Sequence, residues 1–102
     1  MEVFYKGRRH RTIATGEYDS ASGRLIVKKG SIVSESIASF KGAATVKKLR
    51  LENVDANGRL KTDLQFLSPS AAAAFVAGYS ANGLTAWHVG KHKTLRNYLM
   101  NR

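Results

Sequence analysis

The stretch SPSAAAAFVAGYSANGLTAW, residues 68–87, contains a helix start, an alanine-rich run and the only tryptophan of the chain. A serine hydroxyl in front of a helix can accept a hydrogen bond from a free backbone N–H group, and proline fits the first helical position without losing a bond. Ser68 and Pro69 therefore predict that a helix begins here. The expected buried stripe of this helix, at the spacing i, i+3, i+4 and i+7, consists of Ala72, Phe75, Val76 and Tyr79.

A turn and a short strand are expected after this helix. Asn82 and Gly83 both tolerate positive φ, so they predict a turn. Residues 84–89 suit a strand, and Trp87 within them is expected in the core, because large aromatic side chains are mostly buried. Residues 94–100 then predict a terminal helix that docks on the core.

The chain before this stretch predicts a hairpin, a helix and a further strand. Two runs at 12–18 and 24–29 flank a short polar loop with a glycine, which is typical of a β-hairpin. Residues 40–50 follow an approximate helical period, and residues 59–66 alternate with a period of two. The outer face of the helix at 40–50 is expected to be basic, with Lys41, Lys47, Lys48 and Arg50.

These elements predict a small α+β fold, in which antiparallel strands or hairpins pack with two or three helices. The 102 residues are enough for one compact core and too few for two separate ones. We expect a basic N-terminal segment at 1–11 and a single compact domain at 12–102.

Composition restricts where such a chain works. It contains no cysteine, so it has neither disulfides nor thiolate metal sites. No stretch approaches the roughly 18 apolar residues that a membrane span needs, and residues 1–6 carry charge on both sides of a short apolar run, unlike a signal peptide. We therefore expect a cytoplasmic protein without a membrane partner.

The charge is strongly positive and unevenly distributed. Seventeen Lys and Arg against seven Asp and Glu give a formal net charge of +10. All acidic residues lie in the first 63 positions, so the rest of the chain is purely cationic. Such a surplus raises the concentration of anions around the molecule, which favours nucleic acid as a partner, ahead of acidic protein surfaces and anionic membranes. The alternative is that the charge serves solubility only.

The sequence contains no pattern that indicates an enzyme or a cofactor site. The carboxylates are scattered, and several lie beside expected turns. His88 and His92 are four residues apart, an interval that suits a metal only on a helix, and Gly90 interrupts the segment. We expect no catalytic residue, no metal site and no cofactor, and we expect these histidines on the surface.

Contacts to phosphate groups are expected from exposed basic side chains. The helix that begins at Ser68 has no acidic residue in its first turn, so its free N–H groups could meet a phosphate, although an ordinary serine cap also explains the pattern. Tyr5 and Tyr18 are expected to be accessible for stacking. The expected nucleic-acid-binding residues are Arg8, Arg9, Arg11, Lys28, Lys29, Lys47, Lys48, Ser68, Ser70, Lys91 and Lys93.

A protein–protein interaction module is the alternative function. The alanine-rich helix has a second face of small residues, which lets another backbone approach closely. In that case the positive charge is incidental, and a separate protein partner binds this face or the strand of Trp87. The small residues are Ser70, Ala74, Ala77 and Gly78.

Several short motifs resemble a known family, the domain of unknown function 4357. They comprise residues 68–73, Gly78, residues 80–83, Trp87 and residues 93–95. The same Ser-Ala-Asn-Gly and Trp pattern is similar to the restriction-enzyme adenine-methylase-associated module.

The resemblance covers about residues 12–96 and adds little about activity. The family is often found at the C-terminus of GIY-YIG nucleases and in restriction-modification-associated proteins, which implies a place near DNA by analogy. No nuclease domain precedes the module here, so catalysis is expected only from a separate partner. His92 stands before Lys93 where the family pattern has a glycine, so a different local turn is expected.

Overall fold

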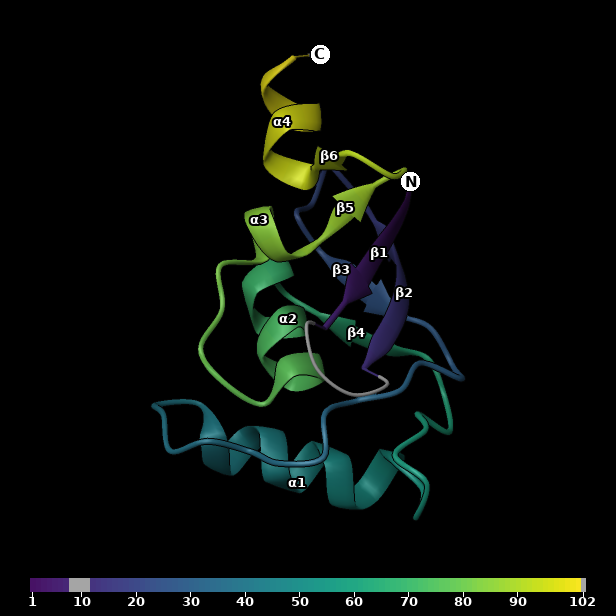
Figure 1. Cartoon of the computed structure of the whole chain (residues 1–102), viewed down its shortest axis with the longest axis vertical. Coiled ribbons are helices and arrows are strands. Elements are labelled where there is room, and N and C mark those ends of the chain that lie inside the picture. Colours follow the sequence, from purple (N-terminus) through teal and green to yellow (C-terminus); the bar gives the residue numbers. More distant parts are fainter. Residues whose placement is uncertain (8–11, 102) are drawn as a thin grey trace.

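A computed structural model describes residues 1–7 and 12–101 of the protein (Figure 1). Its strands are β1 (Glu2–Lys6), β2 (Ile13–Tyr18), β3 (Leu25–Val27), β4 (Leu64–Phe66), β5 (His88–Val89) and β6 (Lys93–Thr94). Its helices are α1 (Ala43–Asn53), α2 (Pro69–Ala77), α3 (Gly83–Ala86) and α4 (Leu95–Met100). The strands form one antiparallel sheet in the order β4-β3-β2-β1-β5-β6. The small α+β fold predicted from the sequence is confirmed.

One face of the sheet forms the core. Side chains alternate along each strand, so Val3 and Tyr5 of β1 are buried while the other three β1 residues are exposed. α2 packs against the buried face, where the ring centroids of Phe75 and Phe66 are 5.2 Å apart. The largest fully buried side chains are Trp87, Phe75, Leu25, Leu60, Leu95, Val3, Val27 and Val76.

The predicted hairpin is confirmed, but the folded domain begins earlier than residue 12. β2 and β3 pair with the register Gly16↔Val27, as the runs at 12–18 and 24–29 predict. Residues 2–6 form β1, which lies between β2 and β5 in the middle of the sheet. They belong to the domain because their alternate side chains complete its core.

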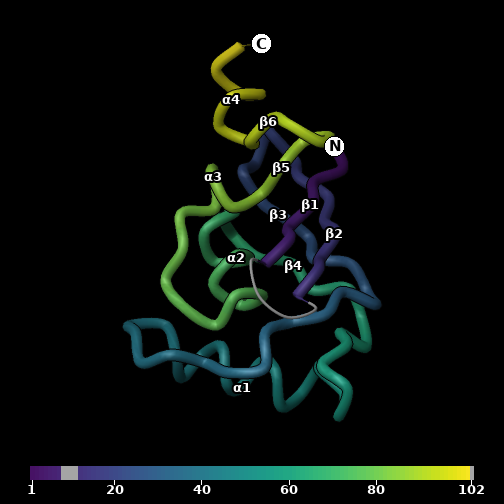
Figure 2. Tube along the Cα trace, viewed as in Figure 1, coloured from purple at the N-terminus to yellow at the C-terminus, as the bar shows by residue number. Residues whose placement is uncertain are grey.

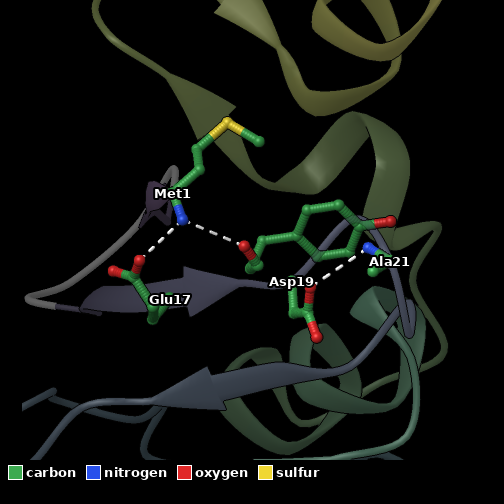
Figure 3. Close-up of polar contacts among 5 residues, drawn as sticks. Met1, Glu17, Asp19 and Ala21 are labelled. Atoms are coloured by element: carbon green, nitrogen blue, oxygen red, sulfur yellow. Dashed lines mark hydrogen bonds and ion pairs between the residues drawn. The ribbon is translucent and has the colours of Figure 1, made fainter.

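The corner where β1 starts and β2 ends is joined by polar contacts (Figure 3). The amino nitrogen of Met1 donates to the Glu17 Oε1 at 2.6 Å and to the Tyr18 carbonyl oxygen at 3.0 Å. In the following turn, the Asp19 carboxylate accepts a bond from the backbone N–H of Ala21 at 3.1 Å. These contacts hold the β2–β3 connection in place.

α2 begins as its sequence predicts, but it ends before Tyr79, which was expected in its buried stripe. The Ser68 hydroxyl accepts a bond from the N–H of Ala71 at 3.1 Å, and Pro69 occupies the first turn. The helix ends at Gly78, whose φ of 82° is left-handed. A Cβ at this position would lie 2.3 Å from the Ser36 carbonyl oxygen, so glycine is required for space as well as for conformation.

The strand predicted at 84–89 is wrong over its first half, which is the one-turn helix α3. The Asn82 side chain accepts a bond from the N–H of Leu84 at 3.0 Å and caps α3, so the Asn-Gly pair starts a helix instead of the predicted turn into a strand. Gly83 lies against α2, since a Cβ there would be 2.1 Å from the carbonyl carbon of Pro69. Trp87 is fully buried, as predicted, and its Nε1 donates to the Pro69 carbonyl oxygen at 3.0 Å.

The strand predicted at 59–66 is shorter in the structure. β4 comprises only its last three residues, paired with β3. Leu60, further back, is buried and pairs with Val54 at the end of α1. The predicted terminal helix is confirmed, because α4 covers most of residues 94–100 and buries Leu95.

α1 is attached to the rest of the molecule by an arginine that the sequence places on its outer face. Arg50 is half-buried and donates from Nη2 to the Phe75 carbonyl oxygen at 2.7 Å and from Nη1 to the Ser34 carbonyl oxygen at 2.8 Å. The carbonyl of Val76 accepts a further bond at 3.2 Å. Burial lowers the pKa of Arg50 to about 10, so the side chain stays cationic at neutral pH. Arg50 therefore binds the C-terminal carbonyls of α2, where a cation is favourable.

The molecule is elongated, with extents of 39 × 24 × 24 Å. α1 lies at one end of the long axis, and the β5–β6 hairpin and α4 lie at the other (Figure 1, Figure 2). Among the described residues, the helices are all too short or too polar to cross a membrane.

Candidate nucleic-acid interface

The structure separates the predicted basic residues into two groups. Lys28 and Lys29 follow β3, and Lys47 and Lys48 are on α1, where all four are exposed. Lys91 and Lys93 are exposed in the β5–β6 hairpin, at the opposite end of the long axis (Figure 2). Arg8, Arg9 and Arg11 lie outside the described residues. The predicted set therefore does not form one cluster.

Long-range pairing adds two basic residues to Lys28 and Lys29. The N–H of Gly30 donates to the Leu60 carbonyl oxygen at 2.9 Å, and the N–H of Leu60 donates to the Ser31 carbonyl oxygen at 2.8 Å. Segment 28–32 thus runs beside segment 59–61, whose Arg59 and Lys61 are exposed. We call these four cations, Lys28, Lys29, Arg59 and Lys61, the basic cluster.

The two carboxylates beside the basic cluster, Asp63 and Asp55, accept hydrogen bonds from backbone N–H groups. The Asp63 Oδ1 accepts from the N–H of Lys29 at 2.7 Å, and its Oδ2 lies 3.4 Å from the Lys28 Nζ. These contacts, the backbone bond first, lower the pKa of Asp63. Asp55 accepts bonds from the N–H groups of Arg59 and Asn57, at 3.0 and 2.8 Å, which lower its pKa in the same way. Both carboxylates stay ionised at neutral pH and offset part of the cluster's charge.

An open groove of about 1300 Å³ lies between α1 and the segments that precede and follow it. Its basic lining residues are Lys47, Arg50 and Arg59. Its acidic lining residues are Glu35 and Asp55. Lys48 is exposed but does not line the groove. The remaining lining residues are Thr12, Ile32, Val33, Ser34, Ile37, Leu51, Val54, Ala56, Asn57 and Gly58. The groove therefore connects Lys47 with the basic cluster through Arg59.

The sheet face opposite the core is exposed and carries apolar side chains. Phe4 keeps 38% of its surface exposed and Ile13 keeps 51%. Residues directly opposite each other on antiparallel strands point to the same side of the sheet. Phe4 is opposite both His88 and Thr15, and the N–H of Lys28 donates to the Thr15 carbonyl oxygen at 2.9 Å. His88 is in turn opposite Thr94, so one row on this face consists of Thr94, His88, Phe4, Thr15 and Lys28.

Two further rows flank the first. Lys6 is opposite Ile13, Ile13 is opposite Ile32, and Ile32 is opposite Arg59, which makes a second row with a cation at each end. We call the two rows that contain Lys28 and Lys6 the cationic rows. On the other side of the first row, a third row contains two carboxylates, and we call it the acidic row: Glu2, Glu17, Ile26 and Gln65.

Phe4 is not among the predicted contact residues, although the local sequence contains a signal for its exposure. Residues 2–6 alternate with a period of two, which puts Phe4 on the same side as Glu2 and Lys6. An aromatic residue on the polar side of a strand is exposed. The partners of Phe4 in its row required the pairing of β1 with β2 and β5, which no local pattern shows.

The tyrosines expected to be accessible are buried. Tyr5 and Tyr18 point into the core, with 7% and 8% of their surface exposed. Burial, followed by the neighbouring Tyr79 side chain, raises the pKa of Tyr5 to about 12. Tyr79, expected in the buried stripe of α2, is instead 51% exposed, because the helix ends before it at Gly78. All three tyrosines are therefore placed opposite to the prediction: Tyr5 and Tyr18 are buried, and Tyr79 is exposed.

The start of α2 has partners within the chain. Ser68 caps the helix, and the Ser70 hydroxyl accepts a bond from the N–H of Gly83 at 2.9 Å. The face of small residues is also used internally, since Ala77 is buried and Gly78 lies against Ser36. The contacts of Ser68 and Ser70 in the structure are thus structural ones.

The two histidines near the C-terminus lie in different surroundings. His88 is half-buried in its row, with Nδ1 3.1 Å from the Ala86 carbonyl oxygen, and His92 is exposed. Throughout residues 1–7 and 12–101, no three His, Asp or Glu side chains gather closely enough to hold a metal ion.

Comparison with known proteins identifies the family. The sequence model of the domain of unknown function 4357 matches residues 4–99, which is nearly the whole chain. The chain therefore belongs to this family. The match starts within β1, in agreement with the place of β1 in the sheet. No curated protein and no solved structure matches the chain.

Proposed function

We propose that this member of the domain of unknown function 4357 family is a non-enzymatic accessory module that binds nucleic acid through phosphate contacts. The observation that supports the proposal best is the basic cluster. Pairing of segments 28–32 and 59–61 brings together four exposed cations that are far apart in the sequence. A patch of this kind attracts a phosphate backbone independently of base sequence.

The proposed surface includes the groove beside the basic cluster. Lys47 lines the groove together with Arg59, so a phosphate backbone that passes over the cluster also meets α1. Glu35 and Asp55 line the same groove and set a limit on the number of phosphates that it accepts. The excess of cations over the whole chain, seventeen against seven, adds a long-range attraction.

A salt titration tests the proposal. Fluorescence anisotropy of a labelled oligonucleotide is expected to show binding in dilute buffer that weakens by about a thousandfold between roughly 50 and 200 mM salt, if about six phosphates are contacted. Absence of binding to both DNA and RNA at low salt contradicts the proposal.

Two charge-matched variants locate the surface. Replacing Lys29 and Lys61 by Glu removes the same net charge as replacing Lys91 and Lys93 by Glu, at the opposite end of the molecule. We expect the first pair to weaken binding by at least tenfold more than the second. Equal effects would mean that total charge, and not the basic cluster, attracts the nucleic acid.

A further inference from the structure

We propose that the open face of the sheet binds single-stranded nucleic acid, with bases stacked on Phe4 and phosphates held by Lys6, Lys28 and Arg59. This inference rests on the proposed function and names its ligand and its site. It starts from the two cationic rows, whose nine residues include three cations and no carboxylate.

The apolar centre of these rows distinguishes a single strand from a duplex. Phe4 and Ile13 are neighbours across β1 and β2, in successive rows, and both are substantially exposed. A duplex presents phosphates at its rim and hides the faces of its bases, so it cannot use such side chains on a broad sheet. An unpaired base can stack on an aromatic ring, whatever its identity.

The cations are placed around this centre as a phosphate backbone requires. Lys6 and Arg59 stand at the two ends of one row, with two isoleucines between them, roughly 14 Å apart by the spacing of neighbouring strands. Lys28 ends the other row beside Thr15. An oligonucleotide of a few nucleotides that crosses the sheet thus places the flat faces of its bases over the centre and its phosphates near both margins.

Carboxylates define the limits of the site. Glu2 and Glu17 of the acidic row are opposite each other and repel phosphate, so they mark one border of the bound strand. On the other side, Ile32 and Arg59 also line the groove beside α1. The bound single-stranded nucleic acid is therefore expected to leave the sheet toward Lys47. Asp63, paired with Lys28, weakens that lysine as a phosphate ligand, which makes Lys6 and Arg59 the stronger contacts.

Competition between two probes tests the inference. The first is a labelled oligothymidine of about ten nucleotides, within the roughly 4–16 that a small single-strand-binding domain covers. The second is a duplex of the same length. We expect the single strand to bind at least tenfold more tightly at low salt.

Substitution of Phe4 tests the stacking. Phe4→Thr keeps a residue that suits a strand but removes the ring, and it is expected to weaken oligothymidine binding by roughly five- to a hundredfold. Phe4→Trp retains a stacking surface and should restore binding. Leu67→Thr is the matched control, since Leu67 is 75% exposed and follows β4, outside the two cationic rows, and it should leave affinity unchanged.

The charges are tested in the same assay. Lys6→Gln should weaken binding and reduce the salt slope by about one, whereas Lys93→Gln, at the other end of the molecule, should not. Glu2→Gln removes a repulsive charge from the acidic row without breaking the Met1–Glu17 contact, and it should strengthen binding. Circular dichroism and thermal melting confirm that each variant is folded.

The outcomes separate this inference from the proposed function. If duplex binds as tightly as single strand and Phe4→Thr has no effect, the open face is not the site, while phosphate binding by the basic cluster stands. If neither probe binds at low salt, both fail. If the protein self-associates and Phe4→Thr abolishes this, the face binds a second copy and the inference is overturned.

Discussion

The two longest helices are attached to the domain in different ways. α2 has nine residues and buries five of them, whereas α1 has eleven and buries only Val46. α1 depends in addition on the Arg50 guanidinium, which binds carbonyl groups at the end of α2. One helix is thus held by apolar packing and the other largely by polar bonds. The contrast teaches that the domain combines an apolar core with a helix at one end of its long axis whose attachment depends largely on one side chain.

The largest expected effect is at the centre of α2. Phe75→Ala removes a fully buried ring that packs on Phe66, and it should lower the free energy of unfolding by about 3–5 kcal/mol. Urea denaturation measures this value. Tyr79→Ala is the control, because Tyr79 lies just beyond the helix and is exposed. It should lower the free energy of unfolding far less. Equal losses would mean that α2 is not held by its buried stripe.

Removal of the arginine tests the attachment of α1. Arg50→Met leaves the carbonyls of Ser34 and Phe75 without their donor, and we expect a loss of about 2–3 kcal/mol. Hydrogen exchange should accelerate in α1 and much less in β2. Arg50→Lys keeps the charge but not the fork of donors, so it should recover only part of the stability. Lys48→Met, on the exposed side of α1, should be neutral; uniform acceleration over the whole domain would show that α1 unfolds only with the core.

The helix cap of α2 is expected to matter less. Ser68→Ala removes the acceptor for the N–H of Ala71, which typically costs about 1 kcal/mol. Ser68→Asp keeps an acceptor and adds a negative charge at the positive end of the helix, so it should be at least as stable as the wild type. Thermal melts compare the two variants. A stable Ser68→Ala variant would mean that the contacts of α3 alone hold this end of α2.

The smallest effect is expected on α1. Leu51 is 85% exposed, and Leu51→Ser should change the free energy of unfolding by no more than about 0.5 kcal/mol. The same urea titration measures it. A larger loss would show that Leu51 packs against a neighbour, so that α1 is held by more apolar contact than its buried residues indicate.

Some elements are predictable because their signals are local. Ser68 and Pro69 define the start of α2 by hydrogen bonding and backbone conformation within a few residues. The hairpin of β2 and β3 is equally local. By contrast, residues 84–86 are helical because Asn82 caps them and Gly83 packs on Pro69, and the second of these contacts joins segments that are distant in sequence.

The candidate site was less predictable than the fold. Lys28 and Lys29 were recognised from charge alone, but Arg59 and Lys61 became their neighbours only through the pairing of two distant segments. Arg50 is indistinguishable from the exposed lysines of α1 in the sequence. It differs from them because its position on the helix faces the carbonyl end of α2.

By itself the sequence determined the positive charge, the family, the α+β class and the start of α2, since each depends on composition or on interactions between close neighbours in the chain. Only the tertiary structure decided which cations stand together, which tyrosines are buried and that Phe4 lies in the middle of an exposed row. These properties depend on strand order and register, because the side of the sheet that a residue shares with its neighbours is set by pairing across the chain.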